Sequence, residues 1–538
     1  MSSSSLKAGM VCAAQPEAVE AGVEVLRQGG NAVDAAVATA LVQAVVDPQM
    51  CGIGGFGCIN ILHPVHGSFC IDFYARAPLA ARENMWAHKL VAESADGFGF
   101  FLSDRSNELG YLSVATPTAL LGLDRALVRL GTRRLADLLA PAIEHAREGV
   151  LVRPHMAAFW DQVPTEGRAP HRDLLTSFEA TRRIYVKPDG SLYRLGERVR
   201  NPGLADTLAR IGEAGVEDFF RGDIADRIVA DMRAHGGLLS ARDLDRCRVR
   251  ESGALEGRYR GCTIVTNAPP GGGATLIQML NILENFDLTA MGHNSTQYIA
   301  TVAEAMKIGA IDRERYLGDP EFVDVPLAML LSKSYAADLA QNIRLGGKAH
   351  VPRFVSIEAR DTTQACVVDA EGICVSLTHS LGTPSGVVTE GLGFMYNGAM
   401  AAFDPRPGRA GSIAPGKART SSIAPTIVLK AGAPFLVLGA PGGTFITPGI
   451  LQAILNVVDF GMNALEAVSA PRFCATSDVI GLTNRIPRAI ERALVEKGYP
   501  VSRTPYNYYY AGVHAIRISE GKLDGGADPG RDGMALVA

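Results

Sequence analysis

The segment from Asp361 to Ser380 holds residues whose types and spacing could carry out acyl transfer. Its periodicity predicts two short strands around a turn at 369–372, with Thr362 at the head of the first strand. A cut before Thr362 would place a hydroxyl nucleophile beside its own free α-amine. Such an amine, with an unperturbed pKa of about 7.7–8.0, can accept the hydroxyl proton near neutral pH. Taken alone, the segment also fits a plain strand, because threonine favours β structure.

Two later segments could support the same chemistry. A strand-like run ends at Gly442 and Gly443, and Thr447 and Pro448 are predicted to cap and open the helix that follows. Backbone N–H groups of a Gly-Gly turn can approach a developing oxyanion, because no side chain blocks them. The segment at 419–422 could supply hydroxyl donors. A tight turn and a polar loop are the alternatives for these two segments.

The elements that must position these residues follow from hydrophobic spacing. Asn31 is predicted to cap an Ala-rich helix that ends at Asp47, and residues 58–73 are predicted to form a hairpin. The stretch 118–350 is mostly helical by its three- and four-residue spacing, and the last third turns to strands. This order predicts an α+β fold in which helices cover antiparallel sheets. No linker divides the chain, so we expect one interlocked body.

Composition excludes several classes of function. The chain has 538 residues, is 47% hydrophobic and carries a formal net charge of −4, with no Lys/Arg run. Nucleic-acid and membrane partners are therefore not expected. The N-terminus lacks the apolar core of a secretory signal, and the nine cysteines are scattered without a CxxC pair. We therefore expect a cytoplasmic protein with reduced thiols.

Metal and cofactor motifs give no positive signal. The chain has no HExxH, GxSxG or GK[ST] pattern, and we expect neither a metal nor a cofactor. The pair His63 and His66 spans a Pro-containing turn, which favours a surface turn over a metal site. Gly52–Gly57 matches GxGxxG, but a helix precedes it and a strand follows, the reverse of a dinucleotide-binding context. A loop beside a substrate pocket or a structural turn fits it better.

An ordered series of segments resembles the γ-glutamyltranspeptidase family of N-terminal nucleophile hydrolases. The resemblance spans about residues 9–536 and rests on segments that include GGNAVDAAVATAL, DPQMCGIGGFG, EAMKIGAIDRERYLGDP, DTTQACVVDAEGICVSLT, TSSIAPTIVL and GAPGGTFI. It implies a four-layer αββα sandwich with two antiparallel sheets between helical layers. It also implies self-cleavage between Asp361 and Thr362, giving a large subunit 1–361 and a small subunit 362–538 that stay interlocked, and it is compatible with a homodimer of that heterodimer.

The resemblance also implies roles for individual residues. Thr362 matches the catalytic nucleophile, and Ser380 matches a hydroxyl residue that hydrogen-bonds it. The oxyanion-hole pair is matched by Gly442 and Gly443, and the two serines that bind the substrate carboxylate are matched by Ser421 and Ser422.

Other positions depart from the glutathione-cleaving members of that family. Tyr74 stands where those members carry the arginine that grips the glutamyl α-carboxylate, and Arg76, two residues on, could hold a carboxylate placed differently. Ala399 and Ala402 replace the residues that hold the α-amine, and Gly382 replaces an asparagine. The grip on an α-amino acid head group is therefore lost while the catalytic residues are kept.

These observations predict an amidohydrolase with an acyl-enzyme on Thr362. The expected substrate is a small carboxylate-bearing amide, either oxamate-like or a dicarboxylic acyl amide, as in the oxamate amidohydrolase and cephalosporin acylase branches. Water or an amine could be the final acceptor. The alternatives are a true γ-glutamyltransferase or glutathione hydrolase, and a non-catalytic binding protein that keeps the fold.

Overall fold

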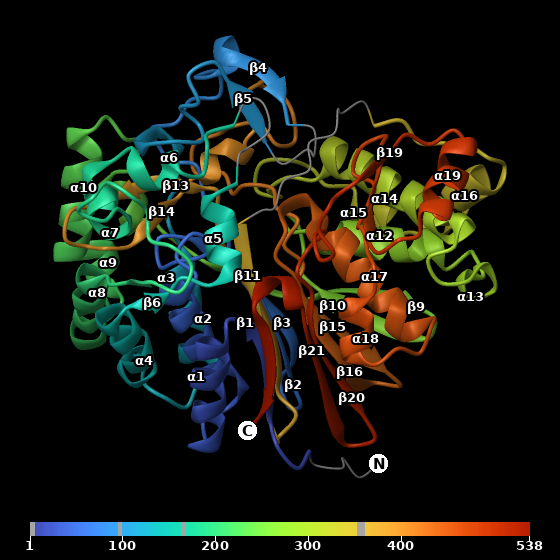
Figure 1. The fold of residues 1–538 in the computed structure, drawn as a ribbon, viewed down its shortest axis with the longest axis horizontal. Coiled ribbons are helices and arrows are strands. Elements are labelled where there is room, and N and C mark those ends of the chain that lie inside the picture. The colour runs from blue at the N-terminus through green and yellow to red at the C-terminus, as the bar shows by residue number, and fades with distance from the viewer. Residues whose placement is uncertain (1–5, 95–98, 163–167, 352–360) are drawn as a thin grey trace.

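The computed structural model describes residues 6–94, 99–162, 168–351 and 361–538, with Asp361 described by its backbone alone. Two large sheets lie at the centre of the molecule, with helices gathered on either side of them (Figure 1). Every strand pairing described within these two sheets is antiparallel. The mixed α/β fold with antiparallel sheets predicted from the sequence is thereby confirmed.

The first sheet contains the strand that begins at the predicted nucleophile. Among the described residues its order is β22-β1-β11-β12-β2-β3-β8. The bounds in that order are Gly533–Val537, Met10–Ala14, Asp361–Val368, Cys374–Gly382, Phe56–His63, Gly67–Phe73 and Arg250–Gly253. The hairpin predicted at 58–73 is β2 and β3, and the two strands predicted around 369–372 are β11 and β12.

The second large sheet is built mostly from the last third of the chain. Its order among the described residues is β21-β20-β16-β15-β10-β9. The bounds in that order are Lys522–Ala527, His514–Ser519, Ala433–Gly439, Thr426–Lys430, Cys262–Thr266 and Leu255–Tyr259.

The faces of the strands follow the two-residue period of β structure. In β11, Ala365 and Val367 pack in a core shared with helices, whereas Cys366 and Val368 pack in a core with residues of the second sheet. The even-numbered side chains of β11 therefore point into the space between the two sheets. Thr362 belongs to this even-numbered set.

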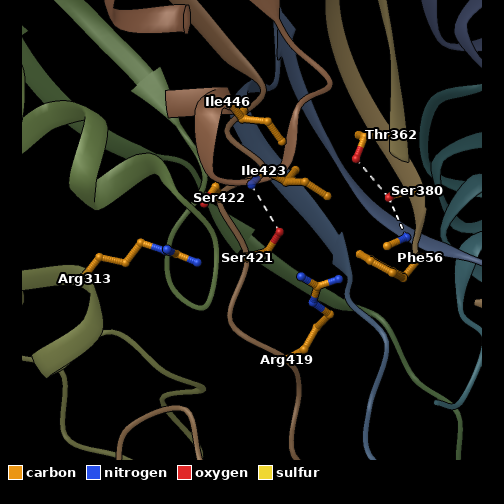
Figure 2. A pocket seen from close by; sticks show the side chains of 11 residues that line it. Phe56, Arg313, Thr362, Ser380, Arg419, Ser421, Ser422, Ile423 and Ile446 are labelled. Carbon is orange, nitrogen blue, oxygen red and sulfur yellow. Dashed lines mark hydrogen bonds between the residues drawn. The ribbon is translucent and has the colours of Figure 1, made fainter. Parts of the chain in front are cut away.

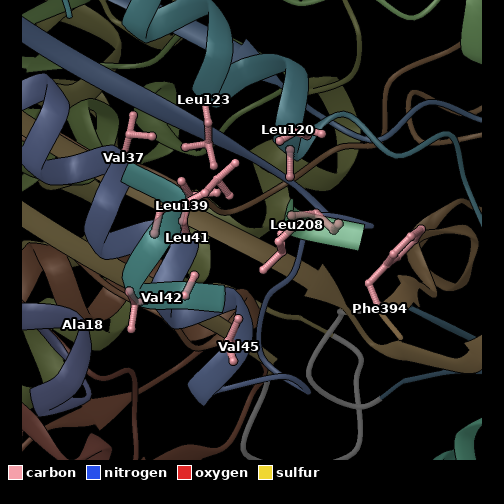
Figure 3. Close-up of a cluster of buried hydrophobic side chains, with 14 of the residues drawn as sticks. Ala18, Val37, Leu41, Val42, Val45, Leu120, Leu123, Leu139, Leu208 and Phe394 are labelled. Carbon is pink, nitrogen blue, oxygen red and sulfur yellow. The ribbon is translucent and has the colours of Figure 1, made fainter. Parts of the chain in front are cut away.

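Helices from the first half of the chain cover the outer face of the first sheet (Figure 1). They are α1 (Pro16–Arg27), α2 (Ala32–Val46), α3 (Ala119–Leu130), α4 (Leu135–Glu148), α5 (Pro154–Trp160), α6 (Asp173–Thr176), α7 (Glu179–Tyr185), α8 (Pro202–Ala214), α9 (Glu217–Arg221), α10 (Asp223–Ala234) and α11 (Ala241–Asp245). Figure 3 shows their apolar contact, in which Leu41 and Val42 of α2 lie near Leu139 of α4. Asn31 caps α2 as predicted, and its side chain accepts hydrogen bonds from two backbone N–H groups of the first turn.

A second helical group covers the other sheet and encloses a separate apolar core. It consists of α12 (Gly273–Leu283), α13 (Leu288–Met291), α14 (Thr296–Tyr316), α15 (Leu327–Leu330), α16 (Lys333–Arg344), α17 (Ile446–Val458), α18 (Ala464–Ser469) and α19 (Arg488–Glu496). Across the described part of the chain, no helix combines the length and apolar character needed to span a bilayer.

Gln43 of α2 ties the first sheet to its helical cover. Its Nε2 donates to the carbonyl of Ala14 in β1 at 3.1 Å and to Oγ1 of Thr363 in β11 at 3.1 Å. Its Oε1 lies 3.0 Å from Nε2 of His379 in β12. Burial lowers the pKa of His379 to about 3, so this imidazole is neutral at physiological pH. The fully buried side-chain amide of Gln43 thus holds together three neighbouring strands, β1, β11 and β12, close to the start of β11.

We expect Gln43→Leu to lower the free energy of unfolding by about 3 kcal/mol, because it leaves several buried polar groups unpaired at about 1–3 kcal/mol each. Denaturant unfolding followed by circular dichroism measures this. Gln28→Leu is the matched control, since Gln28 is exposed and its side-chain amide donates to Oε1 of Glu24 at 2.8 Å; it should change stability by less than about 0.5 kcal/mol. Equal effects of the two substitutions would contradict the role given to Gln43.

Candidate active site

Thr362 lies at a break in the pairing of β11 with β12. Asp361 pairs with Gly382 and Thr363 pairs with His379, so two residues of β12 oppose Thr362 alone. Such a bulge bends a strand and redirects the side chains around it, and bulges are common beside active sites. The Thr362 side chain keeps the even-numbered face of β11, which points into the space between the sheets, and the bulge marks the end of the regular pairing there. The Thr362 residue is 4% exposed.

Ser380 of β12 holds the hydroxyl of Thr362. The two side-chain oxygens are 3.0 Å apart, and the backbone N–H of Gly382 donates to Oγ of Ser380 at 2.8 Å. The Gly382 contact fixes the rotamer of Ser380, which in turn orients Oγ1 of Thr362 (Figure 2). The structure therefore brings together the predicted nucleophile and its predicted hydroxyl partner.

The Gly442–Gly443 turn lies beside this pair. Both residues have positive φ, 137° and 58°, a region that favours glycine, and Gly443 lines the same pocket as Thr362. A short 3₁₀ turn at Gly443–Phe445 leads directly into α17, which begins at Ile446. The prediction that Thr447 caps this helix and Pro448 opens it is therefore wrong, because the glycine turn itself starts the helical winding.

Ser421 and Ser422 line the same pocket from the segment before β15. The backbone N–H of Ser421 donates to the carbonyl of Pro270 at 2.8 Å, and its Oγ accepts from the N–H of Ile423 at 3.2 Å. The glycine loop that precedes α12 lies behind them, since a Cβ at Gly272 would collide with the backbone of Ser422. That loop supports the pocket wall from behind.

Two arginines also line the pocket, and no motif in the sequence predicts a role for either. Arg419 is 4% exposed, and its guanidinium carbon lies 4.8 Å from the ring centroid of Phe56. Arg313 reaches the pocket from α14 (Figure 2). Burial, with the positive charge of Arg313, lowers the pKa of Arg419 to about 9, which leaves it charged at neutral pH. None of the described residues that line the pocket is acidic.

Tyr74 and Arg76, predicted to bind substrate, do not line this pocket. Tyr74 is 1% exposed, and its hydroxyl accepts from Nδ2 of Asn267 at 2.7 Å. Arg76 lies 3.5 Å from a carboxylate oxygen of Asp319 and 3.6 Å from one of Glu321. Both side chains are committed to contacts within the protein. Gly382, in contrast, does line the pocket.

Arg531, near the C-terminus, holds the backbone of the predicted nucleophile. Its Nη2 donates to the carbonyl oxygen of Thr362 at 2.8 Å, and its Nη1 lies 2.9 Å from Nε2 of His155 in α5. Burial, followed by the charge of Arg531, lowers the pKa of His155 well below its usual range. The only sequence signal for Arg531 is its place in the Gly/Asp-rich tail at 527–533.

The Gly52–Gly57 segment packs closely against β12. It follows α2 and leads into the first residues of β2, and a Cβ at Gly55 would collide with the backbone of Ser380. Within the described ranges, no three His, Cys, Asp or Glu side chains gather as a metal site would require. The nine cysteines are free, and all but Cys247 are buried.

Comparison with known proteins identifies the family. The model of the family described as gamma-glutamyltranspeptidase matches residues 18–538. The chain belongs to the γ-glutamyltranspeptidase family. The resemblance found in the sequence is thereby confirmed, and the protein is an enzyme of a family that acts on amide bonds.

Relatives within the family carry two kinds of name. The acylase ACY 1 proenzyme of Pseudomonas sp. (strain V22) is 36% identical, over 98% of this chain and 93% of the relative. The glutathione hydrolase proenzyme of Escherichia coli (strain K12) is 34% identical, over 87% of this chain and 81% of the relative. Among solved structures, the cephalosporin acylase from Bacillus halodurans superposes with a TM-score of 0.87 at 29% identity, over 100% of this chain and 97% of that one.

Ser380→Ala should lower kcat by about 10- to 100-fold, because a positioning hydrogen bond worth about 1.5–3 kcal/mol is lost and tenfold in rate corresponds to about 1.4 kcal/mol. Steady-state hydrolysis of an acyl p-nitroanilide measures it. Ser376→Ala is the matched control on the same face of β12, because that hydroxyl donates to the carbonyl of Leu438 at 2.8 Å. It should lower stability and leave kcat near the wild-type value. A Ser380→Ala enzyme with wild-type kcat would remove Ser380 from the mechanism.

Proposed function

We propose that this enzyme is an autoprocessed N-terminal threonine amidohydrolase that cleaves an amide of a small carboxylate-bearing acyl group. The observation that carries the proposal is the contact between Thr362 and Ser380, whose hydroxyls lie 3.0 Å apart in a pocket shared with Gly443 and the two serines Ser421 and Ser422. Hydroxyl nucleophile, orienting hydroxyl and glycine turn are the parts that acyl transfer requires.

Processing would begin with Thr362 in the intact chain. Its Oγ1 attacks the carbonyl carbon of Asp361, the peptide C–N bond breaks, and the released nitrogen takes a proton to become the free α-amine of Thr362. The ester so formed is hydrolysed by water, which restores the Thr362 hydroxyl and leaves a carboxylate on Asp361. The products are a large subunit 1–361 and a small subunit 362–538. The proenzyme names of the acylase and glutathione hydrolase relatives support this step.

The two subunits would stay together after cleavage because they share both sheets. In the first sheet β1 of the large subunit lies between β22 and β11 of the small one, and β12 pairs with β2. In the second sheet β15 of the small subunit pairs with β10 of the large one. We place these layers, with the helices outside them, in the four-layer αββα arrangement of N-terminal nucleophile hydrolases.

Catalysis would use the free amine as general base. The α-amine of Thr362 takes the hydroxyl proton as Oγ1 attacks the substrate amide carbon, and the N–H groups of Gly442 and Gly443 stabilise the oxyanion. The protonated amine then gives its proton to the leaving nitrogen, and an ester on Thr362 remains. Water, activated by the same amine, hydrolyses this acyl-enzyme and releases the acid. Ser421 and Ser422 hydrogen-bond the carboxylate of the acyl group.

Processing is tested by Thr362→Ala, which should remain one chain of 57.0 kDa while the wild type separates into two. Intact mass spectrometry should locate the wild-type cut between Asp361 and Thr362. Thr363→Ala is the matched control: it removes the adjacent hydroxyl, which binds Gln43, and should still be cleaved. A wild-type preparation that stays a single inactive chain would overturn the proposal.

The substrate class is tested by comparing glutaryl and γ-glutamyl p-nitroanilides, which differ by an α-ammonium group. We expect kcat/KM to favour the glutaryl compound by at least about tenfold, because the pocket lining holds two arginines and no acidic residue among those described. Such a lining repels an ammonium group. Faster turnover of the γ-glutamyl compound, stimulated by a dipeptide acceptor, would establish the γ-glutamyltransferase alternative.

A further inference from the structure

Arg419 occupies space that glycine at position 382 leaves open. A Cβ built on Gly382 would lie 2.8 Å from Nη1 of Arg419, closer than such atoms approach in proteins, and 3.3 Å from the ring of Phe56. Gly382 also has a φ of 77°, which L side chains rarely adopt. The guanidinium of Arg419 therefore lies against Gly382 at the end of β12 and packs on the ring of Phe56.

The backbone around Arg419 is anchored on both sides. Its N–H donates to the carbonyl of Ala75 at 3.1 Å, and the N–H of Ala418 donates to Oδ2 of Asp319 at 2.8 Å. The Arg419 side chain thus leaves a fixed backbone and lies across an aromatic face. A planar guanidinium held in this way has the geometry that carboxylates recognise best.

The charge of the pocket indicates the class of ligand. Arg313 and Arg419 line it together with the hydroxyls of Ser421 and Ser422, and the described lining contains no carboxylate. Two like charges in a buried pocket repel each other, and an anionic ligand offsets that repulsion.

We propose that Arg419 determines substrate specificity by binding a carboxylate at the end of the acyl chain remote from the scissile amide, and that Gly382 is the residue that admits its guanidinium. This inference rests on the proposed function of the same pocket. It assigns the acyl group to the monoamides of dicarboxylic acids, with Arg313 as the second cation at that end of the pocket.

A purely structural role for Arg419 predicts a different result. An arginine that only packs on Phe56 and donates to the carbonyl of Thr420 would affect stability and all substrates alike. The measurement is therefore a ratio, kcat/KM for glutaryl p-nitroanilide divided by kcat/KM for pentanoyl p-nitroanilide. The two compounds have the same chain length and differ only in the terminal carboxylate, so effects on folding or on the nucleophile cancel.

The wild-type ratio should exceed about 30, the lower end of what a desolvated charge pair contributes. Arg419→Gln should bring the ratio to near one, and Arg419→Lys should give an intermediate ratio because an ammonium cannot bind a carboxylate through two parallel N–H groups. Arg409→Gln is the matched control: Arg409 lies on the same segment, is exposed and does not line the pocket, so the ratio should not change. A wild-type ratio near one, or an unchanged ratio in Arg419→Gln, would overturn the proposal.

Gly382→Asn tests the steric part of the inference independently. Asparagine tolerates positive φ better than most residues, but its Cβ would displace the guanidinium of Arg419. The ratio should fall as it does in Arg419→Gln, although Arg419 is still present. A Gly382→Asn enzyme with the wild-type ratio would show that the two positions are not linked.

Binding to the single-chain Thr362→Ala protein separates this inference from the proposed function, because it requires no turnover. Calorimetric titration should show that glutarate binds at least about 30-fold more tightly than pentanoate, and that adding Arg419→Gln removes the difference. If the wild type neither cleaves itself nor turns over amides, the proposed function fails, yet this titration still decides the role of Arg419. Equal binding of the two acids to Thr362→Ala would overturn that role even in an active enzyme.

Discussion

The pairing of β11 with β12 governs the geometry of the candidate site. Over Thr363–Val368 the two strands are in regular antiparallel register, and one residue earlier two residues of β12 oppose Thr362. A one-residue change of register turns side chains to the opposite face of a sheet. Ser380 lies on the face that holds Thr362, and Leu381 lies on the opposite face in the apolar core with residues of α2, so both follow the alternation of β12. The register changes beyond this pair, where Asp361 pairs with Gly382.

The space between the sheets is rigid for a related reason. Gln364 lies in this space, two residues after Thr362 on the same face of β11. Its Nε2 donates to Oγ of Ser376 at 3.0 Å, and its Oε1 accepts from the hydroxyl of Thr378. Its amide packs against Gly439 of the opposite sheet, where any Cβ would collide with it. A satisfied buried network of this kind fixes the distance between the sheets. Acyl transfer would need such fixed distances, because the proposed nucleophile Thr362 lies in β11 of the first sheet and the proposed oxyanion turn Gly442–Gly443 follows β16 of the second.

The sequence predicted the elements well and the side-chain directions less well. Period-two spacing located β11 and β12, and the Asn31 cap and the 58–73 hairpin were found because local chemistry specifies them. The start of α17 was predicted wrongly because the 3₁₀ turn at Gly443–Phe445, which leads into the helix, has no side-chain cap to mark it. No local pattern predicts the contacts of Arg313 and Arg531. Arg313 reaches the pocket from α14 and Arg531 reaches the carbonyl of Thr362 from near the C-terminus, and the position of both segments depends on the whole fold.

The placement of Arg76 and Arg419 follows from one backbone contact. The segment holding Tyr74 and Arg76 runs beside 417–419, with Arg76 bridged to Ala418 and the carbonyl of Ala75 accepting from the N–H of Arg419. Adjacent extended segments send neighbouring side chains to opposite sides, so only one of the two arginines can face the pocket. Arg76 turns to Asp319, whose carboxylate also accepts from the N–H of Ala418, and its charge is balanced there. The segment expected to bind the substrate therefore acts as the support for the arginine that lines the pocket.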